Sequence, residues 1–100
     1  MNNRDYIKSI TDIGLILQAL IKNRFRKTVK IIYTKGKYKS LYVSFYRSPY
    51  VYQFYVEDHA GYYLMYLIKN DKIVKKELIR KEELVNTFYQ KLGYFFRIIN

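Results

Sequence analysis

Glu57, Asp58 and His59 are the one run in this chain whose side chains could carry acid–base chemistry or hold a metal ion. An imidazole or a carboxylate can act as a general base, and both bind metals. The three residues fall in an expected turn, however, where adjacent side chains rarely point at a common atom. A metal site would need further histidines or cysteines at ligand spacing, and the sequence has one His and no Cys. We therefore predict no catalytic residue, no metal, no cofactor and no enzymatic activity.

Cationic and aromatic side chains suggest a different chemistry. The chain has 19 Lys and Arg against 8 Asp and Glu, a net charge of +11, and 13 tyrosines. Lysines attract phosphates and tyrosines can stack on bases, so the composition favours nucleic acid as partner, DNA in preference to RNA. The candidate nucleic-acid-binding residues are Arg24, Arg26, Lys27, Lys35, Lys37, Lys39, Tyr42, Tyr46 and Arg47. The alternative is that tyrosine only forms good strands and lysine only covers a surface.

A second basic group occurs further along the chain, between Lys69 and Lys81, but carboxylates accompany it. Its cations are Lys69, Lys72, Lys75, Lys76, Arg80 and Lys81, and its acids are Asp71, Glu77, Glu82 and Glu83. Because the charges offset one another, we interpret this group as a solvated sheet edge.

Helical spacing of apolar residues marks both ends of the chain. Tyr6, Ile10, Ile13, Leu17 and Leu20 recur every three or four residues, which predicts a helix over Arg4–Asn23 with Asp5 in its first turn and Lys22 in its last. A second helix is expected over Lys81–Leu92, closed by a C′ glycine at Gly93. Residues 94–99 could extend this helix or form a sixth strand, and we favour the strand.

Between the helices, alternating apolar and polar residues predict five strands. Their expected bounds are Val29–Thr34, Tyr38–Tyr46, Tyr50–Glu57, Tyr62–Lys69 and Lys72–Ile79. Turn residues separate them, namely Gly36 in KGK, Ser48-Pro49, the run DHAG and Asn70-Asp71. In the second strand, Leu41, Val43 and Phe45 fall on one face and Tyr42, Ser44 and Tyr46 on the other. The order describes one α+β domain over residues 1–100, with an N-terminal helix, a mainly antiparallel five-stranded meander and a C-terminal helix.

The absence of Cys and of long apolar runs bears on location. No disulfide framework is available, which favours a reducing compartment, and we expect the cytoplasm. The longest unbroken apolar run, Tyr62 to Ile68, is far shorter than the ~18 residues that a spanning helix needs. Asp5 and Asp12 interrupt the N-terminal segment, and no small-residue cleavage site follows it, so we expect neither a signal peptide nor a membrane association.

Apolar residues on the first helix exceed what one sheet face would cover. Leu15 and Ile16 are expected to point away from the seam made by Ile10, Ile13 and Leu17. Either the second helix or a partner subunit must cover them, and we predict a homodimer with Leu15 and Ile16 at its interface. A homodimeric protein-interaction or structural protein, without a nucleic-acid role, is thus the alternative to the nucleic-acid-binding function.

The strand sequences also suggest an origin. The chain has Tyr-, Ile- and Lys-rich strands such as LYVSFY and VYQFYV, two Ala and no Cys. In this composition it resembles small orphan proteins of viruses infecting hyperthermophilic archaea. The resemblance implies an intracellular accessory protein that binds nucleic acid or intercepts a host protein, often as a dimer, in the host cytoplasm. AT-rich bacteria and their phages produce similar compositions.

Overall fold

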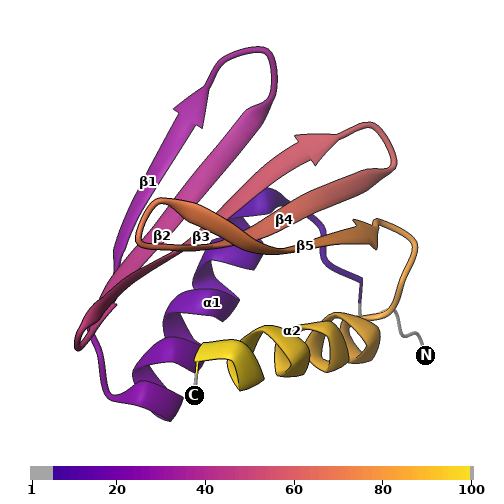
Figure 1. Ribbon diagram of the computed structural model, residues 1–100. Coiled ribbons are helices and arrows are strands. Elements are labelled where there is room, and N and C mark those ends of the chain that lie inside the picture. Colours follow the sequence, from indigo (N-terminus) through magenta and orange to yellow (C-terminus); the bar gives the residue numbers. More distant parts are fainter. Residues whose placement is uncertain (1–5, 100) are drawn as a thin grey trace.

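A computed structural model describes residues 6–99 as a helix at each end of the chain with a five-stranded sheet between them. The elements are α1 (Ile10–Phe25), β1 (Lys30–Lys35), β2 (Lys39–Arg47), β3 (Tyr50–His59), β4 (Tyr62–Lys69), β5 (Lys72–Arg80) and α2 (Val85–Ile99). All neighbouring strands pair antiparallel, in the order β1-β2-β3-β4-β5 (Figure 1). The predicted α+β class and meander are confirmed, and strand bounds differ from expectation by no more than two residues.

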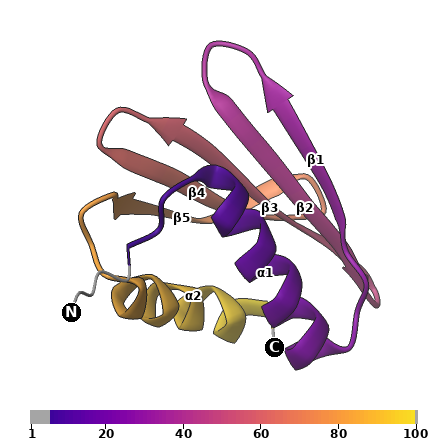
Figure 2. The same ribbon diagram turned by 180° about the vertical axis from the view of Figure 1, so that it is seen from behind.

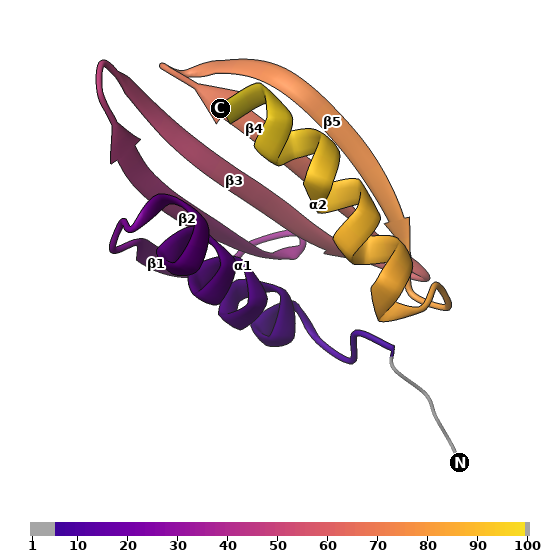
Figure 3. The same cartoon turned by 90° about the horizontal axis from the view of Figure 1, so that it is seen from below.

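The alternation of side chains gives this sheet two unlike faces. Leu41, Val43 and Phe45 are buried, as predicted, while Tyr42 and Tyr46 lie on the opposite face with Ser44. Both helices cover the face that carries the buried residues, α1 beneath β2 and β3 and α2 beneath β5 (Figures 2 and 3). We call this the helix face. Within residues 6–99 no element covers the other side, which we call the open face.

The start of α1 differs from the prediction. Ser9 is the N-cap: its hydroxyl accepts a hydrogen bond from the Asp12 backbone N–H, and the Asp12 carboxylate accepts one from the Ser9 N–H. This capping box begins the helix at Ile10. Tyr6 instead forms a β-bridge with Leu84, so the expected helical start at Arg4 is wrong for the described residues. Arg4 and Asp5 themselves lie outside those residues.

The end of α1 contacts α2. The helix continues past Asn23 to Phe25, and Arg26 follows in the left-handed region at φ 58°. The Phe25 ring meets the Phe96 ring of α2 edge-on, with centroids 5.6 Å apart. Leu15 is exposed, as expected, but Ile16 packs partly buried against the core, so its predicted orientation away from the seam is wrong.

The second helix was predicted too early in the chain. It begins at Val85 rather than Lys81 and continues through residues 94–99 to Ile99, so the expected sixth strand is wrong. Phe88, Leu92, Phe95, Phe96 and Ile99 are buried at helical spacing, which keeps the helix against the sheet through its last turn. Gly93 therefore lies inside α2, not at a C′ position.

This placement generates a stability prediction. A Cβ at Gly93 would meet no atom within 4 Å, and the residue has ordinary helical geometry. Gly93→Ala should therefore raise the free energy of unfolding by about 0.5–1 kcal/mol, through the lower conformational entropy of the unfolded chain. Thermal and urea unfolding measure the change. Gly61→Ala is the matched control: Gly61 has φ +84°, where alanine is strained, so this variant should be less stable. A destabilised Gly93→Ala would contradict the placement of Gly93 in an open helical position.

Candidate functional site

Glu57 and His59 meet on the open face at the end of β3. They are two residues apart on one strand, so both side chains project from the same side of the sheet. His59 Nε2 lies 3.0 Å from Glu57 Oε1, and the Tyr55 hydroxyl donates a hydrogen bond of 2.6 Å to Glu57 Oε2. Asp58 points to the helix face, where its carboxylate pairs with Lys81 Nζ at 2.5 Å. The expectation that these neighbours would not converge is thus wrong for Glu57 and His59 and right for Asp58.

Aromatic rings enclose His59. The centroid of its ring lies 4.0 Å from that of Tyr38 and 4.8 Å from that of Tyr62, and the Tyr62 ring is nearly parallel to it. Across residues 6–99, no three His, Cys, Asp or Glu side chains come together in a way that could hold a metal ion. The group therefore consists of one carboxylate and one imidazole, both with partners.

The charges of this group follow from its hydrogen bonds. Donation from the Tyr55 hydroxyl, and then contact with His59, lowers the pKa of Glu57 below its ordinary value. Burial, reinforced by the neighbouring Glu57 charge, raises the pKa of Tyr55 to about 12. At neutral pH, Glu57 is ionised with both oxygens engaged and Tyr55 keeps its proton. The Glu57 carboxylate thus fixes Tyr55 and His59 on the open face. Tyr55 stands in a row of rings with Tyr42 and Tyr66, and His59 stands in a row with Tyr38 and Tyr62.

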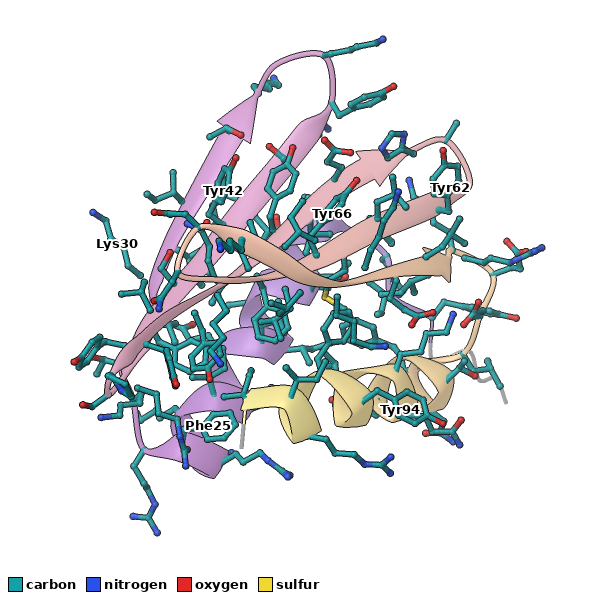
Figure 4. The ribbon with its side chains drawn as sticks, viewed as in Figure 1. Phe25, Lys30, Tyr42, Tyr62, Tyr66 and Tyr94 are labelled. Carbon is teal, nitrogen blue, oxygen red and sulfur yellow. The ribbon has the colours of Figure 1, made fainter. Side chains whose placement is uncertain are left out.

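One of these rows is a tyrosine ladder made of Tyr42, Tyr55 and Tyr66, which lie opposite one another on β2, β3 and β4. The Tyr42 and Tyr55 rings stack at 4.6 Å, and the Tyr55 and Tyr66 centroids are 5.6 Å apart. Lys76 Nζ of β5 lies 5.6 Å from the Tyr66 ring. Figure 4 shows Tyr42 and Tyr66 on the side of the sheet away from the helices. Because rings flank Tyr55 on both sides, it has no free face on which a base could stack.

The predicted nucleic-acid-binding residues do not form one surface. Lys35, Lys37 and Lys39 lie at the turn between β1 and β2, at one end of the sheet; we call them the hairpin tip. Arg47 lies at the other end of β2, eight residues from Lys39, which is about 27 Å along a strand. Arg24, Arg26, Lys27 and Tyr46 are on the Arg47 side, since α1 ends where β1 begins.

That second end gathers more cations than the sequence suggested. Both helices finish there, and two of the sheet's turns, β2–β3 and β4–β5, lie there too (Figure 1). We call it the basic end, and its cations are Lys22, Arg24, Arg26, Lys27, Lys30, Arg47, Lys69, Lys72 and Arg97. Only Arg24, Arg26, Lys27 and Arg47 of these were predicted, because Lys69, Lys72 and Arg97 come from distant parts of the chain and join them only through the antiparallel topology.

Aromatic rings hold several of these cations in place. Arg47 Cζ lies 4.8 Å from the Phe25 ring centroid and Arg24 Cζ 5.5 Å from that of Phe96. Lys69 Nζ lies 3.8 Å above the Tyr50 ring. Figure 4 shows Phe25 near the end of α1, and Lys30 projecting from the edge of the sheet. A ring attracts a cation without neutralising it, so these side chains are positioned while their charge is kept.

Acidic residues lie mostly at the opposite end of the molecule. Within residues 6–99 they are Asp12, Glu57, Asp58, Glu82 and Glu83 at the hairpin-tip end, Glu77 within β5 and Asp71 at the basic end. Asp58 lies opposite Lys39 in the β2–β3 register and pairs with Lys81, so positive charge at that end of the molecule is partly offset. The two ends therefore differ: the basic end has nine cations and one acid.

A shallow hollow of about 380 Å³ marks the end of α1 at the basic end. Lys22, Arg26 and Lys27 line it together with Asn23 and Thr28. The left-handed conformation of Arg26 turns the chain there and brings these cations around one depression. This arrangement can contact an extended anion at several points.

Comparison of the chain with family models, with curated proteins and with solved structures finds no match. None of the helices in the described residues combines the length and apolar character that crossing a bilayer requires.

The Glu57 hydrogen bonds generate a prediction for acid stability. Since folding lowers the pKa of Glu57, the unfolded chain binds more protons near this pKa, and the stabilisation present above about pH 4.5 is lost as pH falls through the folded value. Glu57→Gln should remove this part of the pH dependence. The variant should also lower the pKa of Tyr55 from about 12, though not fully to 10, because burial is the larger cause. Urea unfolding at several pH values and ultraviolet titration of tyrosine measure the two effects. Glu82→Gln, an exposed glutamate, is the control, and equal pH curves for all three proteins would contradict the assignment.

Proposed function

We propose that this protein binds nucleic acid, DNA in particular, by contacts between its basic end and the phosphate backbone. The observation that supports the proposal is the separation of charge: nine cations from both helices, four strands and the link between α1 and β1 gather at one end beside a single acid, Asp71. A net charge of +11 alone would also serve solubility. Separation of the charge concentrates positive potential in one region, which is what a polyanion recognises.

The basic end suits phosphate contacts for a second reason. Most of its cations come from helix ends and strand ends, and Arg24 and Arg47 are further positioned by the rings of Phe25 and Phe96. Cations that are already ordered lose little side-chain entropy on binding. Each phosphate neutralised then releases condensed counterions, so the affinity should fall steeply with salt.

The aromatic residues imply a mainly sequence-independent mode of binding. The tyrosine ladder uses its ring faces internally, so Tyr42 is a weaker candidate for stacking than the sequence suggested. Tyr46 is the exception at the basic end, being 55% exposed and adjacent to Arg47. It supplies one ring on which an unpaired base can stack. A cytoplasmic location and an origin in an archaeal virus stay predictions. A DNA-binding function would be compatible with both.

The proposal predicts which lysines and arginines matter. Lys22→Gln, Arg26→Asn and Lys27→Gln together remove three charges around the hollow at the end of α1 without inserting opposite ones. For duplex DNA, the slope of log affinity against log salt should fall in magnitude by roughly 2.7, and affinity should fall roughly tenfold or more. Fluorescence anisotropy with labelled duplex and single-stranded oligonucleotides across a salt series measures both quantities.

The matched control removes the same number of charges at the other end, by Lys35→Gln, Lys37→Gln and Lys39→Gln. This hairpin-tip variant should change the slope by less than half as much, because five acids share that end of the molecule and lower the positive potential around it. Circular dichroism should show both variants folded. Equal losses in the two variants would show that only net charge matters, and salt-independent binding, or none by wild-type protein at low salt, would refute the function.

A further inference from the structure

The open face exposes more apolar surface than a sheet in water usually does. Exposed fractions there reach 63% for Ile73, 50% for Val51, 43% for Ile32 and 42% for Leu78. These residues surround the tyrosine ladder and the half-buried pair Leu64 and Ile68. Monomeric proteins seldom expose so many apolar side chains on one face. The open face is therefore a candidate interaction surface.

The charged side chains of this face lie along its margins. Lys30 lies on the outer strand β1, and Lys76 and Arg80 lie on the outer strand β5. Within the face, Glu57 is the one carboxylate among the described residues, and Tyr55 and His59 occupy both its oxygens. An apolar centre surrounded by charge is the composition of a protein–protein interface. A nucleic-acid platform would need cations and free ring faces across its centre, whereas the cations of this face lie on its outer strands and the rings of the tyrosine ladder stack on one another.

Two pairs of polar side chains inside the face are hydrogen-bonded to each other. Gln53 Nε2 donates to Ser44 Oγ at 3.1 Å, and the hydroxyls of Thr34 and Ser40 pair with each other. Covering the face would leave these two pairs intact, so they add little to the cost of removing the face from water.

The size of the face matches a stable dimer. Five strands about 4.8 Å apart, with roughly 20–30 Å of strand length, give a footprint on the order of 500 Å², and the relief of the side chains enlarges the accessible area. A standard interface buries about 800 Å² from each partner. The footprint enlarged by this relief is therefore of the order that one side of such an interface requires.

We propose that a second copy of this chain covers the open face, so that two sheets pack face to face about a two-fold axis. The helices then lie on the outside of a four-layer particle. A second copy fits because its face offers the same apolar centre, while its cations lie at the margins, where water can separate them from those of the partner. Lys30 and Tyr46 lie on the open face, but the other eight cations of the basic end lie outside it, so this dimer leaves their phosphate contacts available and uses a surface other than Leu15 and Ile16.

Sedimentation velocity and light scattering at roughly 10 µM protein test the proposal. Wild-type protein should have twice the 12.3 kDa mass of the chain. Ile32→Glu with Ile73→Glu places a charge near each margin of the apolar centre, at side chains that are already exposed in the single chain. The variant should be a folded monomer, with a dimer dissociation constant raised roughly 100-fold or more. Val51→Glu, on the third strand, is a second variant with the same expectation, in case the double change prevents folding.

Leu15→Glu is the matched control, since Leu15 is 56% exposed on α1 and faces away from the sheet. Its mass should equal that of the wild-type dimer. A monomeric wild type at this concentration would overturn the proposal, and so would a Leu15→Glu monomer together with face variants that stay dimeric. Dissociation of the dimer by an excess of single-stranded oligonucleotide would instead assign the face to nucleic acid. Loss of DNA binding by basic-end variants that remain dimeric would leave the two proposals separate.

Discussion

The chain has enough helix to cover one face of its sheet, and the rest of the structure depends on that limit. Alternation in β2, β3 and β4 places Leu41, Phe54 and Met65 against the helices with no exposed surface, and their burial is the main apolar contribution to folding. On the opposite face, no helix among the described residues shields the apolar side chains from water. Cross-strand contact does this in part, because the rings of Tyr42, Tyr55 and Tyr66 shield one another from water.

The sheet was predictable from sequence because strand alternation and turn residues are local signals. β4 was predicted with its exact bounds, and the faces of β2 were assigned correctly. The helix ends were not. Tyr6 fits the helical spacing but pairs with Leu84, a contact between distant parts of the chain, while the capping signal of Ser9 and Asp12 was present and overlooked. At Gly93, burial of the aromatic residues that follow outweighs the roughly 1 kcal/mol that glycine costs inside a helix.

The candidate site was less predictable, because neighbours in sequence and neighbours in space differ in a meander. The run from Arg24 to Arg47 looked like one basic region, but β2 carries its two groups to opposite ends. Lys69, Lys72 and Arg97 join the basic end through strand pairing and the path of α2, which residue spacing does not reveal. Glu57 and His59 could have been placed together, since residues two apart in a strand share a face; the error was to expect a turn where β3 continues.

The weak attachment of β1 has a consequence for the dynamics of the molecule. Five of its six residues are exposed, it pairs only with β2, and its link to α1 includes the Tyr33 hydroxyl, which lies close to Gly14. Such a strand belongs to the least stable part of a native protein and can separate while the remaining four strands stay folded. Each opening would uncover the backbone of the sequence LYVSFY in β2, an apolar segment suited to intermolecular strand addition. Lys30 and Lys35, at the two ends of β1, and Lys39 beside it would then act as gatekeepers, because their mutual repulsion opposes the growth of aggregates from this edge.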